Sequence, residues 1–151
     1  NTYHYLNNIP FADHGALLDP PTADVAARCV SMLSQINKKN YKNVIQKGVE
    51  FLKNEQEEDG SWFGRWGTNY IYGTWSVLHA LKAAGEDMDA NYIKKAIVWI
   101  KNKQNEDGGW GEDCATYWKE KKNMPSIKSM PSQTSWAILS LLITEKINFF
   151  F

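Results

Sequence analysis

Three histidines, two cysteines and 17 acidic residues are the side chains of this 151-residue chain best suited to binding a metal or transferring a proton. His4, His14, His79, Cys29 and Cys114 do not stand at the short spacings typical of zinc sites. No Ser–His–Asp order, phosphate-binding loop or dinucleotide fingerprint occurs. The sequence therefore predicts neither a metal site nor a cofactor.

Two of the carboxylates mark the start of a helix. Asp19 precedes Pro20-Pro21-Thr22, and Asp24 follows two residues later. Proline near an Asp or Thr is typical of a helix N-terminus, so Asp19 or Thr22 is expected to be the cap. On the residues alone, Asp19 and Asp24 cap this helix and pair with its dipole.

Aromatic side chains make up 13% of the chain, with seven Trp and seven Tyr. Such an excess must line a core, an interface or a pocket. Trp66 and Tyr72 stand in the run GRWGTNYIYGT (64–74). On the residues alone, both belong to a core rather than to a site.

The charge balance excludes an electrostatic surface for nucleic acid or for an anionic membrane, because 17 basic residues face 17 acidic ones. The two cysteines are far apart, which favours free thiols in a reducing compartment over a disulfide. The longest apolar run, Trp136 to Ile143, is about half of what a transmembrane helix needs. We expect no transmembrane helix, although contact with a membrane surface stays open.

One motif, Gln-x-x-Asp-Gly-x-Trp, is written twice at an offset of 48 residues. The glycine permits a tight turn with positive φ. The Gln amide is expected to bond the last carbonyls of the preceding helix, which lack partners within it. The motif therefore predicts structural links between repeats, formed by Gln56, Gly60 and Trp62 and again by Gln104, Gly108 and Trp110.

The elements around these motifs are all helical. Apolar residues recur at helical spacing from Val25 to Ile36, and a second amphipathic helix ends near Gln56. Further helices are expected at about 73–84, 90–104 and 132–143, and Gly85 stops the first of these three. Gly73-Thr74-Trp75 and Thr134-Ser135-Trp136 occupy comparable places in the two units.

This order predicts an all-α chain of helical hairpins that repeat about every 50 residues. Such hairpins stack into solenoids or closed rings of helices. Five helices cannot close a double-layered ring, so we expect residues 1–151 to form a single, incomplete α/α barrel or toroid. Residues 143–151, which end in INFFF, are an atypical tail. An open arc should expose an apolar flank where the next repeat would pack.

The repeats resemble the QW motifs of squalene–hopene cyclases and related triterpene cyclases. The resemblance rests on Phe51-Leu52-x3-Gln56-x3-Gly60-x-Trp62 and Trp99-Ile100-x3-Gln104-x3-Gly108-x-Trp110. It extends to NNIPFADHGALLDPPTADVAAR (7–28), GSWFGRWGTNYIYGTW (60–75), GGWGEDC (108–114) and PSQTSWAILSL (131–141).

What the resemblance implies is an (α/α)6 barrel, paired with a second α-barrel, that cyclises squalene to hopene or hopanol without a metal. It implies a monotopic enzyme on the cytoplasmic face of a bacterial membrane. The family's initiating acid belongs to a D-x-D-D motif, which does not occur in these 151 residues. We therefore expect a C-terminal part of the catalytic barrel, inactive alone, whose partners are a squalene-like polyprenyl substrate and the N-terminal cyclase part or another subunit.

The resemblance also assigns roles to individual residues. Asp19, Asp24 and Arg28 match positions near the initiating acid, where they would orient it and tune its acidity. Arg28 would act as a fixed charge and donor, because a guanidinium keeps its proton near neutral pH. Trp66 and Tyr72 match aromatic positions of the cavity and would contact the substrate or an early cation.

Two other classes of protein share part of this pattern. A helical interaction module or split-enzyme partner derived from a cyclase would keep the shape without the reaction. A protein prenyltransferase β subunit shares the helix layout but requires a zinc set of Asp, Cys and His, and the QW loops argue against it.

Overall fold

A computed structural model describes residues 20–144 of the chain. Five α-helices follow in order: α2 (Ala23–Asn37), α3 (Lys42–Asn54), α4 (Tyr70–Ala84), α5 (Asn91–Asn102) and α6 (Pro131–Thr144). Two short 3-10 helices, Cys114–Tyr117 and Lys119–Lys121, interrupt the long loop before α6. This described part contains no strand, so the predicted all-α fold is confirmed. Asp19, His4, His14 and the INFFF tail lie outside the described residues.

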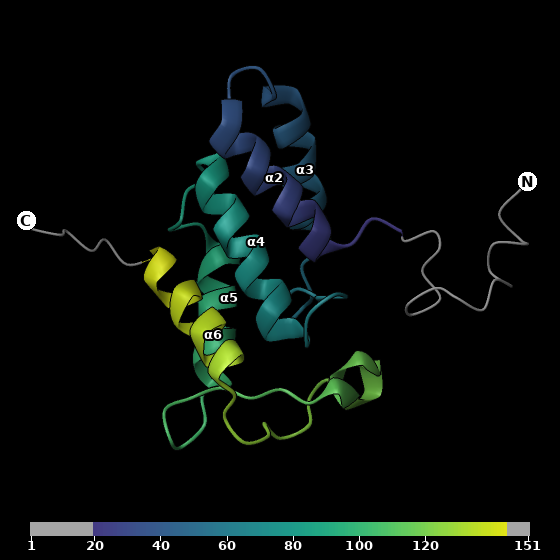
Figure 1. Ribbon diagram of the computed structural model, residues 1–151, viewed down its shortest axis with the longest axis vertical. Coiled ribbons are helices and arrows are strands. Elements are labelled where there is room, and N and C mark those ends of the chain that lie inside the picture. Colours follow the sequence, from purple (N-terminus) through teal and green to yellow (C-terminus); the bar gives the residue numbers. More distant parts are fainter. Residues whose placement is uncertain (1–19, 145–151) are drawn as a thin grey trace, which may run out of the picture.

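The helices form two layers (Figure 1). α4 packs between α2 and α6, and together they make one row. α3 packs behind α2 and α4, whereas α5 packs behind α4 and α6. This alternation of inner and outer helices is an arc of stacked hairpins, as expected for part of an α/α barrel.

Each hairpin buries an apolar cluster around its motif tryptophan. The first cluster joins α2, α3, α4 and α5 around Trp62, with Leu52, Leu78 and Ile93 fully buried. The second surrounds Trp110 with residues of α4, α5 and α6, among them Ile100. Full burial of an apolar side chain stabilises a fold by roughly 1.5–3 kcal/mol, and a large aromatic side chain lies at the upper end of this range. The two motifs are therefore the centres of the two packing units.

Each motif tryptophan closes its loop with the same two hydrogen bonds. The Trp62 indole N–H donates to the Leu52 carbonyl (2.6 Å), and its backbone N–H donates to Thr74 Oγ1 (3.0 Å). Trp110 repeats both bonds, to the Ile100 carbonyl (2.8 Å) and to Thr134 Oγ1 (3.0 Å). Thr74 therefore corresponds to Thr134. Gly73-Thr74-Trp75 and residues 134–136 do occupy comparable places, with a register shifted by one residue.

The expected role of the motif glutamine needs a correction. The indole of the tryptophan, not the Gln amide, satisfies a carbonyl in the last turn of the preceding helix. Gln56 instead donates to the Gly60 carbonyl (2.8 Å) of its own loop and to the Tyr92 carbonyl (2.9 Å) of α5. Gln104 makes the first of these bonds, to the Gly108 carbonyl (2.8 Å). The link between repeats predicted for the motif is therefore present at Gln56.

The motif Asp and Gly shape the turn. Gly60 and Gly108 have φ of 96° and 82°, in the left-handed region predicted for them. Asp59 Oδ1 accepts from the backbone N–H of Ser61 (3.1 Å), and Asp107 Oδ1 accepts from that of Gly109 (2.9 Å). Such Asp-centred turns hold the backbone without help from a helix or sheet.

Apolar side chains remain exposed on both flanks of the arc. Val25, Met32 and Ile36 are 46%, 52% and 68% exposed on α2, and Ile138, Leu139 and Leu142 are exposed on α6. The prediction of one exposed apolar flank is met by α2, and α6 adds a second. Val25, Met32 and Ile36 of the predicted apolar stripe thus face outward, whereas Leu33 packs against the core.

Candidate functional site

Asp24 is fully buried near the N-terminus of α2. Its Oδ2 accepts a hydrogen bond from the backbone N–H of Trp66 (2.8 Å), in the loop before α4. Its Oδ1 is buried without a hydrogen-bond partner among the described residues. Thr22 occupies the cap position as predicted, but its side chain makes no cap bond. Asp24 therefore joins α2 to the loop instead of capping its own helix.

Arg28 lies one turn further along α2. Its guanidinium carbon is 4.5 Å from the centroid of the Trp75 ring and 6.0 Å from that of Tyr72. No ion pair joins Arg28 to Asp24 in the described part of the chain. The Arg28 charge is thus held against aromatic faces, an arrangement worth about 0.5–2 kcal/mol.

Tyr72 belongs to an aromatic cluster, which we define as Tyr72, Trp75 and Trp136. The ring centroids of Tyr72 and Trp136 are 5.0 Å apart, and Trp75 stacks on Trp136 at 5.9 Å with an interplanar angle of 21°. The cluster brings the N-terminal halves of α4 and α6 together on the same row of helices that carries Arg28. Trp136 was not predicted as a site residue, because nothing in its local sequence indicates its partner.

Trp66 lies in the loop before α4 and is 44% exposed. The Arg65 guanidinium carbon is 5.7 Å from the centroid of its ring. The loop passes close over Tyr72, because a Cβ placed on Gly67 would come within 2.5 Å of the Tyr72 ring. The structure thus links the four predicted catalytic and substrate-binding residues that it describes. Asp24 bonds the Trp66 backbone, the Arg28 cation lies near the Tyr72 ring, and one short loop joins Trp66 to Tyr72.

A second group of charges surrounds Lys122, in the long loop before α6. The ammonium of Lys122 contacts Asp59 (3.0 Å) and Glu57 (3.7 Å), and it lies 4.3 Å from the centroid of the Tyr70 ring. Burial, followed by the nearby charges of Glu57, Glu112 and Asp59, raises the pKa of Tyr70 to about 12. The phenol is therefore neutral at physiological pH. The ion pairs of Lys122 therefore link the long loop before α6 to the first motif loop.

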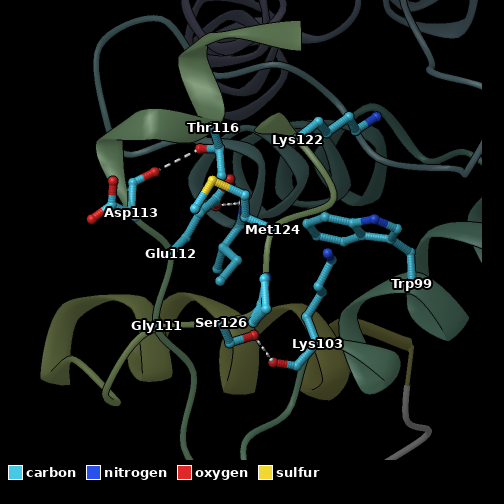
Figure 2. Close-up of a pocket in the computed structure, with 11 residues that line it drawn as sticks. Trp99, Lys103, Gly111, Glu112, Asp113, Thr116, Lys122, Met124 and Ser126 are labelled. Carbon is cyan, nitrogen blue, oxygen red and sulfur yellow. Dashed lines mark hydrogen bonds between the residues drawn. The ribbon is translucent and has the colours of Figure 1, made fainter. Parts of the chain in front are cut away.

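Figure 2 shows a small hollow beside this second group. Trp99 and Lys103 from the end of α5 line one side, and the rest is lined by Ile71 of α4 and by residues of the long loop before α6. None of the predicted site residues borders it. Charged side chains of Glu112, Asp113 and two lysines border the hollow together with apolar ones such as Trp99 and Met124. The aromatic cluster lies elsewhere and offers the kind of surface that binds an apolar chain.

Residues 20–144 contain no group of three or more His, Cys, Asp or Glu side chains placed to hold a metal. His79 is exposed, and its Nδ1 is 3.2 Å from Ser31 Oγ. Cys29 and Cys114 are free and exposed. In the same range, no helix combines the length and hydropathy that crossing a membrane requires.

Comparison with known proteins identifies the family of this chain. A family model described as the squalene-hopene cyclase C-terminal domain matches residues 1–149. The chain belongs to the squalene–hopene cyclase family.

Three relatives show how far the similarity to this family extends. A squalene-hopene cyclase of Schizosaccharomyces japonicus is 60% identical over 97% of this chain, and one of Zymomonas mobilis is 55% identical over 98%. A dammaradiene synthase of Dryopteris crassirhizoma is 36% identical over 94%. The chain spans 22–23% of the length of these curated relatives. The resemblance read from the QW motifs is thereby confirmed.

Sequence reasoning missed Glu112 as well as Trp136. The Glu112 carboxylate accepts hydrogen bonds from the backbone N–H groups of Asn69, Tyr70 and Ile71 (2.9–3.1 Å), at the N-terminus of α4. The only available signal was its place in the run GGWGEDC (108–114) that resembles the family.

Proposed function

We propose that this chain supplies part of the catalytic cavity of a triterpene cyclase of the squalene–hopene type. The complete enzyme protonates a squalene-like polyprenyl substrate and passes the cation through successive ring closures. The observation that carries the proposal is the buried Asp24 carboxylate, which accepts a hydrogen bond from the Trp66 loop. Arg28 lies one turn further along the same helix and contacts the aromatic cluster. A carboxylate, a fixed cation and aromatic faces are what such chemistry requires at one place.

Protonation of an isolated alkene needs an unusually strong acid. Hydrogen bonds and cations that favour the conjugate base make a carboxylic acid stronger. Asp24 Oδ1 is buried and has no partner among the described residues, so it is free to accept a hydrogen bond from a donor on the rest of the enzyme. Asp24 would orient the initiating acid through this oxygen, and the Arg28 charge would favour the conjugate base of that acid. Asp19, by resemblance, would have a similar orienting role.

The cation formed by protonation must then be stabilised without a nucleophile. Aromatic faces do this at about 0.5–2 kcal/mol each. The Arg28 guanidinium already lies over Tyr72 and Trp75, which supports the view that these faces hold positive charge. Tyr72 and the exposed Trp66 would face the substrate chain.

The rest of the cyclase would provide the D-x-D-D acid, and the complete enzyme would work as a peripheral monotopic protein at the cytoplasmic side of the membrane. The product stays open among hopene, hopanol, tetrahymanol and related rings. The likeness to both squalene-hopene cyclases and a dammaradiene synthase supports a common reaction type rather than one product.

A second candidate is a non-catalytic helical module that pairs with another chain. The exposed apolar side chains on α2 and α6 favour some partner on each flank. A split enzyme would use the same flanks, so the flanks alone do not separate the two candidates.

Squalene conversion tests the proposal directly. The matching segment of a squalene-hopene cyclase relative is replaced by this chain, and the chimaera is incubated with squalene in detergent. Cyclic triterpenes detected by gas chromatography would support the proposal. A soluble, folded chimaera that leaves squalene unchanged would favour the non-catalytic module.

A further inference from the structure

Glu112 binds the N-terminus of a helix from which it is far removed in sequence. Its Oε2 accepts from the N–H groups of Asn69 (3.1 Å) and Ile71 (2.9 Å), and its Oε1 accepts from that of Tyr70 (3.0 Å). The first four N–H groups of a helix lack partners within it, and its dipole favours a negative charge there. The cap residue Asn69 makes no side-chain cap bond of its own. Glu112 therefore takes the place of a local cap for α4.

Gln133, on α6, holds Glu112 in this position. The Glu112 backbone N–H donates to Gln133 Oε1, and Gln133 Nε2 donates to the carbonyls of Glu112 and Thr68 (3.1 Å each). The Gln133 side chain is buried, with 4% of the residue exposed. One amide thus joins the second motif loop, the start of α6 and the last residue before the α4 cap.

The turn bound by Glu112 lies between the two aromatic residues proposed for the cavity. Trp66 precedes Asn69 by three residues, and Tyr72 follows Ile71 directly. The loop is packed closely, because a Cβ on Gly64 would come within 2.4 Å of the Asn69 carbonyl oxygen. A displacement of the Asn69–Ile71 turn would therefore move both Trp66 and Tyr72.

Figure 2 shows Glu112 at the border of the small hollow, next to Asp113 and Thr116 and on the opposite side from Trp99. Its carboxylate is half-buried, and the structure gives it three backbone donors and no ion pair among the described residues. A carboxylate that serves only solubility or surface charge would not be aimed at three buried N–H groups.

We propose that Glu112 is a positioning residue for cyclisation, supplied by the second repeat to fix the cavity residues of the first. This rests on the function proposed above. Incorrect placement of an aromatic face leaves a ring-closure cation exposed to early loss of a proton. Substitution of Glu112 should therefore alter which products form, and not only how much enzyme is folded.

The test uses the chimaeric cyclase with Glu112→Gln, assayed well below its melting temperature. A Gln side chain keeps the size of Glu but places an NH2 group where N–H donors converge. We expect the ratio of incompletely to fully cyclised products to rise several-fold. The matched control is Asp113→Asn, because the neighbouring carboxylate accepts from the Ala115 N–H (2.7 Å) in its own 3-10 helix. An unchanged ratio in Glu112→Gln, with product from the parent chimaera, would overturn the assignment.

A measurement on the 151-residue chain requires no activity. Amide hydrogen exchange should become about tenfold faster at Asn69, Tyr70 and Ile71 in Glu112→Gln and stay unchanged at Trp110. Equal exchange in both chains would also overturn the assignment. If the parent chimaera makes no product, the proposed function fails and the catalytic role of Glu112 fails with it, whereas faster exchange would still show that Glu112 anchors α4.

Discussion

The Asp24 carboxylate accepts a hydrogen bond from the Trp66 backbone N–H across 42 residues of sequence, at 2.8 Å. The bond ties the start of an inner helix to the loop that carries an exposed aromatic side chain. Because Asp24 is fully buried, its position is fixed by packing as well as by this bond. Asp24 and the backbone of the Trp66 loop are therefore held together without a substrate.

The two motif tryptophans should differ in how much their indole N–H stabilises the fold. Trp62→Phe leaves the Leu52 carbonyl without its indole donor, at a cost of about 1–3 kcal/mol. Trp110→Phe should cost less, because the Lys103 N–H also donates to the Ile100 carbonyl (3.1 Å). Urea unfolding of both variants measures the difference. Equal losses would contradict this account of the motif.

Alanine substitutions at the two motif glycines should destabilise the fold to different extents, because the space around each glycine differs. Both have positive φ, so an Ala costs about 1–2 kcal/mol in backbone strain at either position. A Cβ on Gly60 would also come within 2.9 Å of the Lys95 backbone carbon of α5, whereas a Cβ on Gly108 meets nothing within 4 Å. Gly60→Ala should therefore lower the melting temperature more than Gly108→Ala. The reverse order would argue against the placement of α5 on the first loop.

Acid should weaken the contact between Lys122 and the first motif loop. Burial by itself raises the pKa of the Asp59 carboxyl, but hydrogen bonds from Ser61 and Lys122 outweigh it and hold the pKa below its ordinary value of 3.8. The resulting stability is complete above that ordinary value and is lost as the pH falls through the lower, folded-state pKa. Between pH 6 and pH 3, urea unfolding should show a smaller loss of stability for Asp59→Asn than for the parent chain. The control is Glu58→Gln, whose exposed side chain should leave the pH dependence unchanged.

The exposed flank of α2 should make the chain self-associate or bind a hydrophobic dye. Replacing Met32 and Ile36 together with Gln should reduce dye fluorescence and light scattering with little change in the melting temperature, because both side chains are more than half exposed. Ile45→Gln serves as the control, since Ile45 is buried and its loss should lower the melting temperature. A parent chain that is monomeric and binds no dye would contradict an open arc of helices.

Much of the fold could be predicted from periodicity and turn chemistry. The helical spacing of apolar residues and the repeated Gly predicted the helical hairpins. Gly85 ends α4 with the left-handed conformation expected of it, at φ of 81°. α4 begins at Tyr70, three residues before the predicted start, because its first N–H groups are capped by Glu112 instead of a local side chain. A cap supplied from 42 residues away leaves no local signal.

The candidate site was less accessible to sequence reasoning. Asp24, Arg28, Trp66 and Tyr72 could be singled out only by their resemblance to a family, because periodicity does not reveal contacts between distant elements. The offset of 48 residues pairs Glu112 with Gly64, so comparison of the two repeats gave no reason to suspect the carboxylate. The stacking of Trp136 on Trp75 likewise depends on the packing of α6 against α4.

The most direct test of the account is squalene turnover by the chimaeric cyclase with Asp24→Asn. An Asn keeps an oxygen that can accept from the Trp66 N–H but removes the carboxylate charge, so the fold should persist while the initiating acid loses its partner. The account predicts at least a ~100-fold loss of turnover, in line with general-acid catalysis, at an unchanged melting temperature. Turnover equal to that of the parent chimaera would contradict the claim that Asp24 belongs to the catalytic cavity.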